Sequence, residues 1–104
     1  MRRQKLVLSA QARADLRQIH AYLAERNPRA ADNFVLDLYR KMHSIAELGL
    51  SGTSRDQLQP GLRAISHRER TVYFRVNDSQ THVVRVLHGR QNLTTDDFPE
   101  SDDT

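Results

Sequence analysis

The sequence predicts an α+β domain in which a two-helix antiparallel hairpin packs on one face of a mostly antiparallel sheet of about four strands. Two observations support this fold class. Two amphipathic segments follow each other between residues 10 and 48. The second half of the chain holds strand patterns, above all over residues 71–90 (TVYFRVNDSQTHVVRVLHGR), where a polar turn separates two apolar runs.

Residues 5–26 predict a short strand followed by a helix. The strand covers KLVLS, residues 5–9, and the Ser9 hydroxyl is suited to accept a hydrogen bond from a free amide of the following helix. The helix body extends over residues 10–26, and its apolar stripe is formed by Ala12, Leu16, Ile19 and Leu23.

Residues 27–49 predict a second helix, antiparallel to the first. Asn27 ends the first helix because a residue before proline is pushed out of the helical region, and Pro28 suits the first turn of the next. The second helix ends at Leu48, and Gly49 supplies the left-handed residue that commonly follows a helix. Its apolar face is formed by Ala31, Phe34, Val35, Leu38, Met42 and Ile45. Such a hairpin can cover one face of a sheet.

A polar loop over residues 50–61 leads into the strand region. Its Ser, Gly, Thr, Asp and Pro residues are typical of a surface connection. Residues 62–67 predict a strand, and Arg68 with Glu69 predict a tight turn into the next one.

The strand pair within residues 71–90 has the clearest pattern of the chain. Its first half places apolar side chains at every second position, as Val72, Phe74 and Val76. Residues 77–80 (NDSQ) form the turn, because short polar side chains can bond their own backbone. Residues 83–87 are apolar on both sides of the strand, so we expect this strand to lie centrally in the sheet.

If both hairpins are regular, the pleat sorts the strand side chains into two sets that are both largely apolar. One set holds Arg63, Ile65, His67, Arg70, Val72, Phe74, Val83, Arg85 and Leu87, and the other holds Leu62, Ala64, Thr71, Tyr73, Arg75, Val84 and Val86. Because the helices cover one face only, we expect a second polypeptide to cover the other.

The charges are unevenly distributed along the chain. Five of the 13 acidic residues follow Leu93, so residues 1–93 hold 16 basic and eight acidic side chains, a net charge of +8. All but two of the basic residues are arginines, which favours a partner with carboxylates or phosphates, although an arginine-rich genome would give the same bias. We expect a single domain over residues 1–93 and a mobile acidic tail over residues 94–104.

Several function classes lack their signatures in the sequence. No apolar run approaches the roughly 20 residues that cross a bilayer, and the first residues lack the apolar region of a secretory signal. With no cysteine as well, the expected compartment is the cytoplasm, with no membrane partner. The five histidines are not spaced as a metal site, and no phosphate loop or nucleophile elbow is present, so we expect no cofactor and no metal.

The candidate binding residues are cations of the strand region. In a regular register Arg63, Arg70 and Arg85 fall on one face of the sheet, and Arg90 follows the last strand with His88 nearby. Together they would suit a partner with carboxylates and apolar anchors, or a phosphate backbone. The alternative is that each arginine lays its stem on apolar neighbours and keeps its charge in water.

Several segments resemble the ParE-type toxins of the RelE/ParE toxin–antitoxin superfamily. They are a helical hairpin of the pattern AxADLxxIxxYLAERNPxAA, then RDQLQPGLRAI, RTVYFRV and VVRVLHGRQNL, within residues 5–93. The resemblance implies a helical hairpin on a mostly antiparallel sheet. It also implies a cytoplasmic toxin that forms a hetero-oligomer with its cognate antitoxin, whose C-terminal segment wraps over the toxin.

The superfamily divides by target. RelE-type members, which the resemblance leaves as the alternative, are ribosome-dependent mRNA endonucleases that use arginines and a C-terminal Tyr or His. Arg70 matches one of those arginines and Arg90 is a candidate for another, but the last tyrosine is Tyr73, so His88 alone remains to move a proton.

ParE-type members bind DNA gyrase and stall it with cleaved DNA, without chemistry of their own. The resemblance therefore implies a non-enzymatic gyrase inhibitor that causes growth arrest, contacts DNA only through the gyrase complex, and has no catalytic residue. A basic adaptor without toxicity is a third hypothesis.

Overall fold

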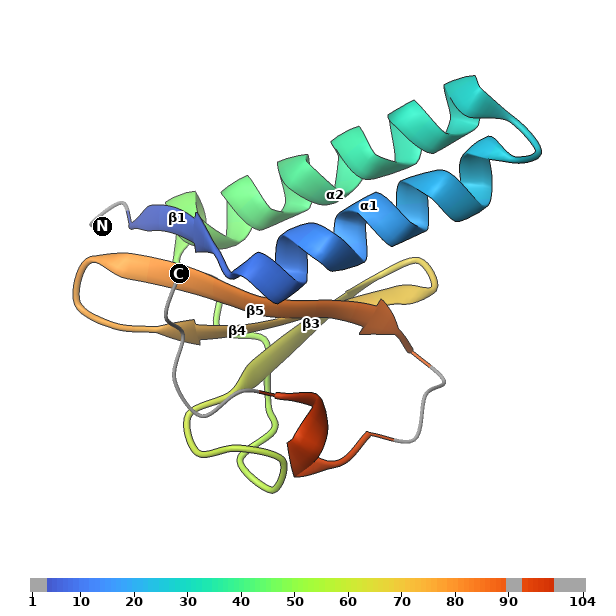
Figure 1. Cartoon of the computed structure of the whole chain (residues 1–104). Coiled ribbons are helices and arrows are strands. Elements are labelled where there is room, and N and C mark those ends of the chain that lie inside the picture. The colour runs from blue at the N-terminus through green and yellow to red at the C-terminus, as the bar shows by residue number, and fades with distance from the viewer. Residues whose placement is uncertain (1–3, 90–92, 99–104) are drawn as a thin grey trace.

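The computed structural model describes residues 4–89 and 93–98 (Figure 1). The elements in chain order are β1 (Lys5–Leu8), α1 (Ala10–Ala24), α2 (Pro28–Leu48), β2 (Thr53–Ser54), β3 (Arg63–His67), β4 (Arg70–Val76), β5 (Gln80–His88) and a 3-10 helix, η1 (Thr95–Asp97). The two helices lie side by side over one face of the sheet in Figure 1, which confirms the predicted α+β fold. None of the described helices is long and apolar enough to span a bilayer.

The sheet has the strand order β1-β5-β4-β3-β2, with β1 parallel to β5 and the other neighbours antiparallel. Among the described residues it has five strands rather than about four, because β2, inside the predicted loop, pairs Thr53 with Ala64 and Ser54 with Arg63. The central strand of the five is β4. The neighbouring strand β5 pairs with β1 only over Gln80 to Val83, so its second half is flanked on one side.

Local signals place three of the four helix ends where the sequence predicts them, whereas α1 ends at Ala24 rather than at residue 26. The Ser9 hydroxyl accepts a hydrogen bond of 2.9 Å from the amide of Ala12 and so caps α1. The Asn27 side chain accepts one of 3.1 Å from the amide of Ala30 at the start of α2. Gly49 ends α2 with a φ of 65°, a left-handed conformation that suits glycine.

The main core lies between the helical hairpin and the sheet. It contains the predicted stripes of both helices, except Ala31, and the side chains that β4 and β5 direct towards them. Its fully buried members include Leu38, Met42, Ile45, Val72, Phe74 and Val83.

A bulge in β5 makes part of the predicted register wrong. Tyr73 pairs with Arg85, but the next residue, Phe74, pairs with Val83, so Val84 has no counterpart on β4. An extra residue reverses the alternation on one strand. Beyond the bulge, Val86 joins the core under the helices, whereas Leu87 packs on the opposite side, the reverse of the regular assignment.

The second apolar face of the sheet is covered by the chain itself. Leu62, Ala64, Tyr73, Val84 and Leu87 form a core with Phe98, which is 3% exposed. The Phe98 ring meets the Tyr73 ring edge to face, with centroids 5.0 Å apart. The premise that a second polypeptide must cover this face is therefore wrong.

The segment that supplies this cover is part of the expected mobile tail. Thr94 and Asp97 form a reciprocal capping box around η1, and Leu93 packs against the second core. The structure thus differs from the expectation for residues 94–98, because one buried aromatic ring outweighs the acidic composition around it. The rest of the predicted tail, residues 99–104, lies outside the described residues.

Candidate functional site

Arg85 is fixed at the β5 bulge by three hydrogen bonds. Its Nε and Nη2 atoms donate to the two carboxylate oxygens of Asp15 in α1, each at 2.8 Å, and its Nη1 donates to the carbonyl of Asp97 at 2.8 Å. The hydrogen bonds to Asp15 raise the pKa of Arg85, against the effect of burial. The charge of Arg85 is therefore neutralised inside the protein.

Asp15 accepts a backbone hydrogen bond from the part of β5 that extends beyond the end of β1. Beyond Leu8, no described strand pairs with β5 on its β1 side, and the start of α1 supplies the missing partners. The Ser9 hydroxyl donates to the carbonyl of Val84 at 2.7 Å, and Asp15 accepts from the amide of Val86 at 2.9 Å. The buried carboxylate thus satisfies both the strand edge and Arg85.

A cleft of about 310 Å³ opens beside this ion pair, between α1 and the adjacent ends of β4 and β5. We call it the cationic cleft. Arg70 and His88 enter it from paired positions on β4 and β5. Its full lining is Asp15, Gln18, Ile19, Tyr22, Arg70, Arg85, Val86, Leu87 and His88.

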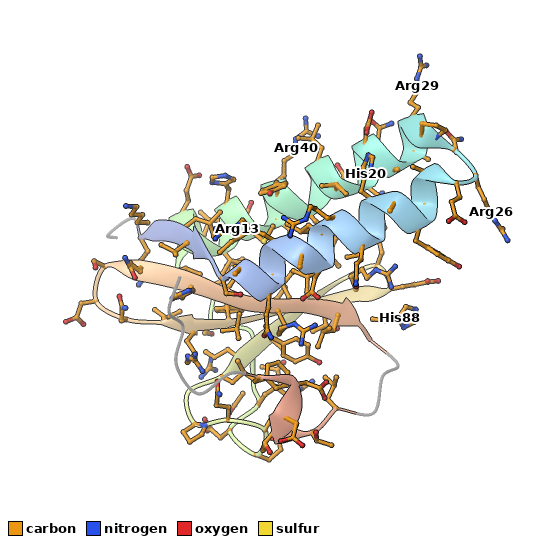
Figure 2. The ribbon with its side chains drawn as sticks, viewed as in Figure 1. Arg13, His20, Arg26, Arg29, Arg40 and His88 are labelled. Atoms are coloured by element: carbon orange, nitrogen blue, oxygen red, sulfur yellow. The ribbon has the colours of Figure 1, made fainter. Side chains whose placement is uncertain are left out.

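Polar groups of the cationic cleft differ in the partners that they have within the protein. Figure 2 shows His88 projecting from the end of β5, and its Nε2 lies 3.7 Å from the Glu69 carboxylate. The Nε of Arg70 is shielded from water and has no hydrogen-bond partner among residues 4–89 and 93–98. Because the Arg70 side chain is only partly buried and its Nε is unpaired, Arg70 is the cleft residue best suited to meet an acceptor from another molecule.

The structure brings three of the five predicted binding residues together. Arg70, Arg85 and His88 line the cationic cleft. Arg63 lies at the other end of the β3–β4 hairpin, where its Nε donates to the carbonyl of Ser51. Arg90 lies outside the described residues. The prediction that Arg63, Arg70 and Arg85 share one face is wrong, because the bulge pairs Arg85 with Tyr73 of the opposite face.

Sequence reasoning missed the residues that α1 contributes. Asp15 is 6% exposed, and Tyr22 is 66% exposed at the cleft. The available signal was the position of Asp15, three residues after Ala12 and four before Ile19, which puts a carboxylate on the buried face of the helix. A charge at such a position needs a partner. No cluster of His, Asp or Glu able to hold a metal ion occurs among the described residues.

Comparisons with known proteins place the fold in a defined group. A family model described as the ParE toxin of the type II toxin–antitoxin system parDE matches residues 6–93. Toxin ParE3 of Caulobacter vibrioides is 35% identical over 51 residues, which are 49% of this chain and 51% of that protein. The match thus spans about half the length of this curated relative.

A solved structure described as the chromosomal ParDE TA system from P. aeruginosa has the same fold. Its matching chain superposes with a TM-score of 0.70 at 22% identity, covering 82% of this chain and 95% of that one. The range matched by the family model includes both α-helices and all of the described strands except Lys5, the first residue of β1, whereas residues 94–98 lie beyond it.

Proposed function

The chain belongs to the ParE toxins of type II toxin–antitoxin systems, and from this membership we propose that it inhibits DNA gyrase by stalling the gyrase complex with cleaved DNA. The observation that carries the proposal is the family match over residues 6–93, which includes the helical hairpin and the sheet from the second residue of β1 onward. The toxin would act in the cytoplasm, touch DNA only through the gyrase complex, and form a hetero-oligomer with a cognate antitoxin that neutralises it.

The cationic cleft is the proposed recognition surface. Arg70 and His88 contact the partner protein, which is the target or the antitoxin, and Arg90 is a further contact after β5. Arg85 stabilises the wall of the cleft through its hydrogen bonds to Asp15. Arg63 lies at the far end of the hairpin, outside the cationic cleft, so any contact of Arg63 with the partner is separate from the cleft contact.

A non-enzymatic mode agrees with the state of Arg85. An arginine that stabilises a developing negative charge in a reaction needs N–H groups that are free to bind that charge. The Nε, Nη1 and Nη2 atoms of Arg85 already donate to Asp15 and to the Asp97 carbonyl. Recognition of a protein surface needs no proton transfer and no free Arg85, so we assign no catalytic residue.

The test uses purified gyrase and relaxed plasmid. Addition of the toxin should prevent supercoiling and accumulate linear DNA covalently held by gyrase, and prior addition of the antitoxin should abolish both effects. In parallel, the toxin is induced in cells and the cellular mRNA is analysed by primer extension, which tests the alternative function of an mRNA endonuclease. Cuts at codon positions with normal plasmid supercoiling would reject gyrase inhibition in favour of a ribosome-dependent endonuclease.

A further inference from the structure

Arg68 occupies a backbone conformation that does not suit arginine. It is the first residue of the two-residue turn between β3 and β4, and its φ of 58° is the only positive value among the described non-glycine residues. Glycine or asparagine adopts this left-handed region readily, whereas a long side chain is strained there. The structure therefore bears a stability cost in order to place an arginine at this turn.

The contacts that Arg68 makes within the chain are too weak to explain that cost. Its guanidinium carbon lies 5.8 Å from the centroid of the Phe34 ring, and its Nη2 lies 3.5 Å from the Asp37 carboxylate. Asp37 also contacts Arg40 at 3.5 Å, so it is not dedicated to Arg68. The Arg68 side chain is 62% exposed, and an exposed pair at this distance contributes little.

Arg68 stands at the edge of a second cavity, of about 460 Å³, between the helical hairpin and the β3–β4 turn. We call it the turn cleft. Leu23 and Phe34 give it an apolar wall, and its charged lining consists of the cations Arg68 and Arg70 with the carboxylate of Glu69. It shares Tyr22, Arg70 and His88 with the cationic cleft, so the two cavities are neighbours.

We propose that the turn cleft receives an apolar side chain of the neutralising antitoxin, and that Arg68 pairs with a carboxylate next to that side chain. The apolar wall favours a protein segment over a phosphate backbone, which would leave Leu23 and Phe34 unused. The net charge of +8 on residues 1–93 favours an acidic segment. The inference rests on the proposed function, because it names the contact through which the toxin is neutralised.

The test measures stability and affinity on the same full-length variant. Arg68→Asn relieves the backbone strain and removes the charge, so its melting temperature should rise by about 2 to 4 °C. Its affinity for the purified protein encoded beside the toxin should fall about ten-fold or more, as expected for one lost charge-assisted hydrogen bond. A residue with a purely structural role would not move the two quantities in opposite directions.

Two further variants separate charge from strain. Arg68→Lys keeps the positive charge and the strained backbone, so it should lose less affinity than Arg68→Asn and gain no thermal stability. Arg40→Ala is the matched control, because Arg40 contacts the same Asp37 but does not line the turn cleft, and it projects from α2 on the side away from the sheet (Figure 2). Its affinity should remain that of the wild type.

The outcomes decide the two proposals separately. Unchanged affinity in Arg68→Asn overturns the turn-cleft contact, and so does a lowered melting temperature, which would mean that Arg68 serves stability. Weaker gyrase inhibition with unchanged antitoxin affinity overturns it too, because Arg68 would then belong to the target contact. A wild-type toxin that binds its antitoxin but leaves gyrase unaffected refutes gyrase inhibition alone.

Discussion

Asp15 and Arg85, seventy positions apart in the chain, form a two-bond ion pair that fastens α1 to β5 at the point where β1 ends. Their side chains are 7% and 18% exposed, respectively. Because Asp15 also accepts from the Val86 amide and Arg85 also donates to the Asp97 carbonyl, the pair joins the helix, the strand bulge and the C-terminal segment. It links the two cores of the protein.

Asp15→Ala should destabilise the fold by about 3 to 5 kcal/mol, because it leaves the Arg85 guanidinium buried without its counter-charge and the Val86 amide without an acceptor. Chemical denaturation of the purified variant gives the value. The double variant Asp15→Leu with Arg85→Met should recover much of the loss, since it removes both charges. A single variant that loses less than about 1 kcal/mol would mean that water reaches this pair.

Gly52→Ala should be more destabilising than Gly61→Ala, although both glycines have positive φ values, 62° and 79°. A Cβ at Gly52 would lie 2.5 Å from the carbonyl oxygen of Ala64, and backbone cannot yield as a side chain can. A Cβ at Gly61 meets nothing within 4 Å, so only the conformational cost of about 1 kcal/mol applies. Thermal unfolding of the two variants compares them, and equal losses would contradict the close approach of β2 to β3.

Phe98→Ala should cost about 3 kcal/mol and raise the fluorescence of a hydrophobic dye, because the ring closes the second core over Leu62 and Val84. Val76→Ala is the control, since Val76 is an apolar residue of β4 that is 45% exposed, and its loss should stay within about 0.5 kcal/mol. If Phe98→Ala behaves like Val76→Ala, the C-terminal segment does not close this face in solution.

The parts of the fold that depend on local chemistry could be predicted from the sequence. Ser9, Asn27 and Gly49 mark the helix ends because a cap needs only neighbouring residues. The bulge at Val84 could not, because residues 83–87 are apolar on both sides and no alternation fixes their register.

The candidate site depends on contacts between distant residues, so the sequence predicts it less well. From the sequence alone Arg85 is a cation available for binding, and only the fold shows that it is paired with Asp15. Phe98 is a single aromatic residue in an acidic stretch, and composition describes that stretch better than its one buried ring. Arg70 and His88 were both among the predicted binding residues, and they meet because they belong to adjacent strands of one hairpin, where Arg70 pairs with His88.

Arg70→Ala should weaken gyrase inhibition about ten-fold while changing the free energy of unfolding by less than about 1 kcal/mol, because its Nε has no hydrogen-bond partner among the described residues. Arg63→Ala is the matched comparison, since Arg63 lies at the opposite end of the β3–β4 hairpin and does not line the cationic cleft. Supercoiling assays on both purified variants, with denaturation curves as the folding control, provide the measurement. Equal losses of inhibition from Arg63→Ala and Arg70→Ala would move recognition away from the cationic cleft and towards the general positive charge of the sheet.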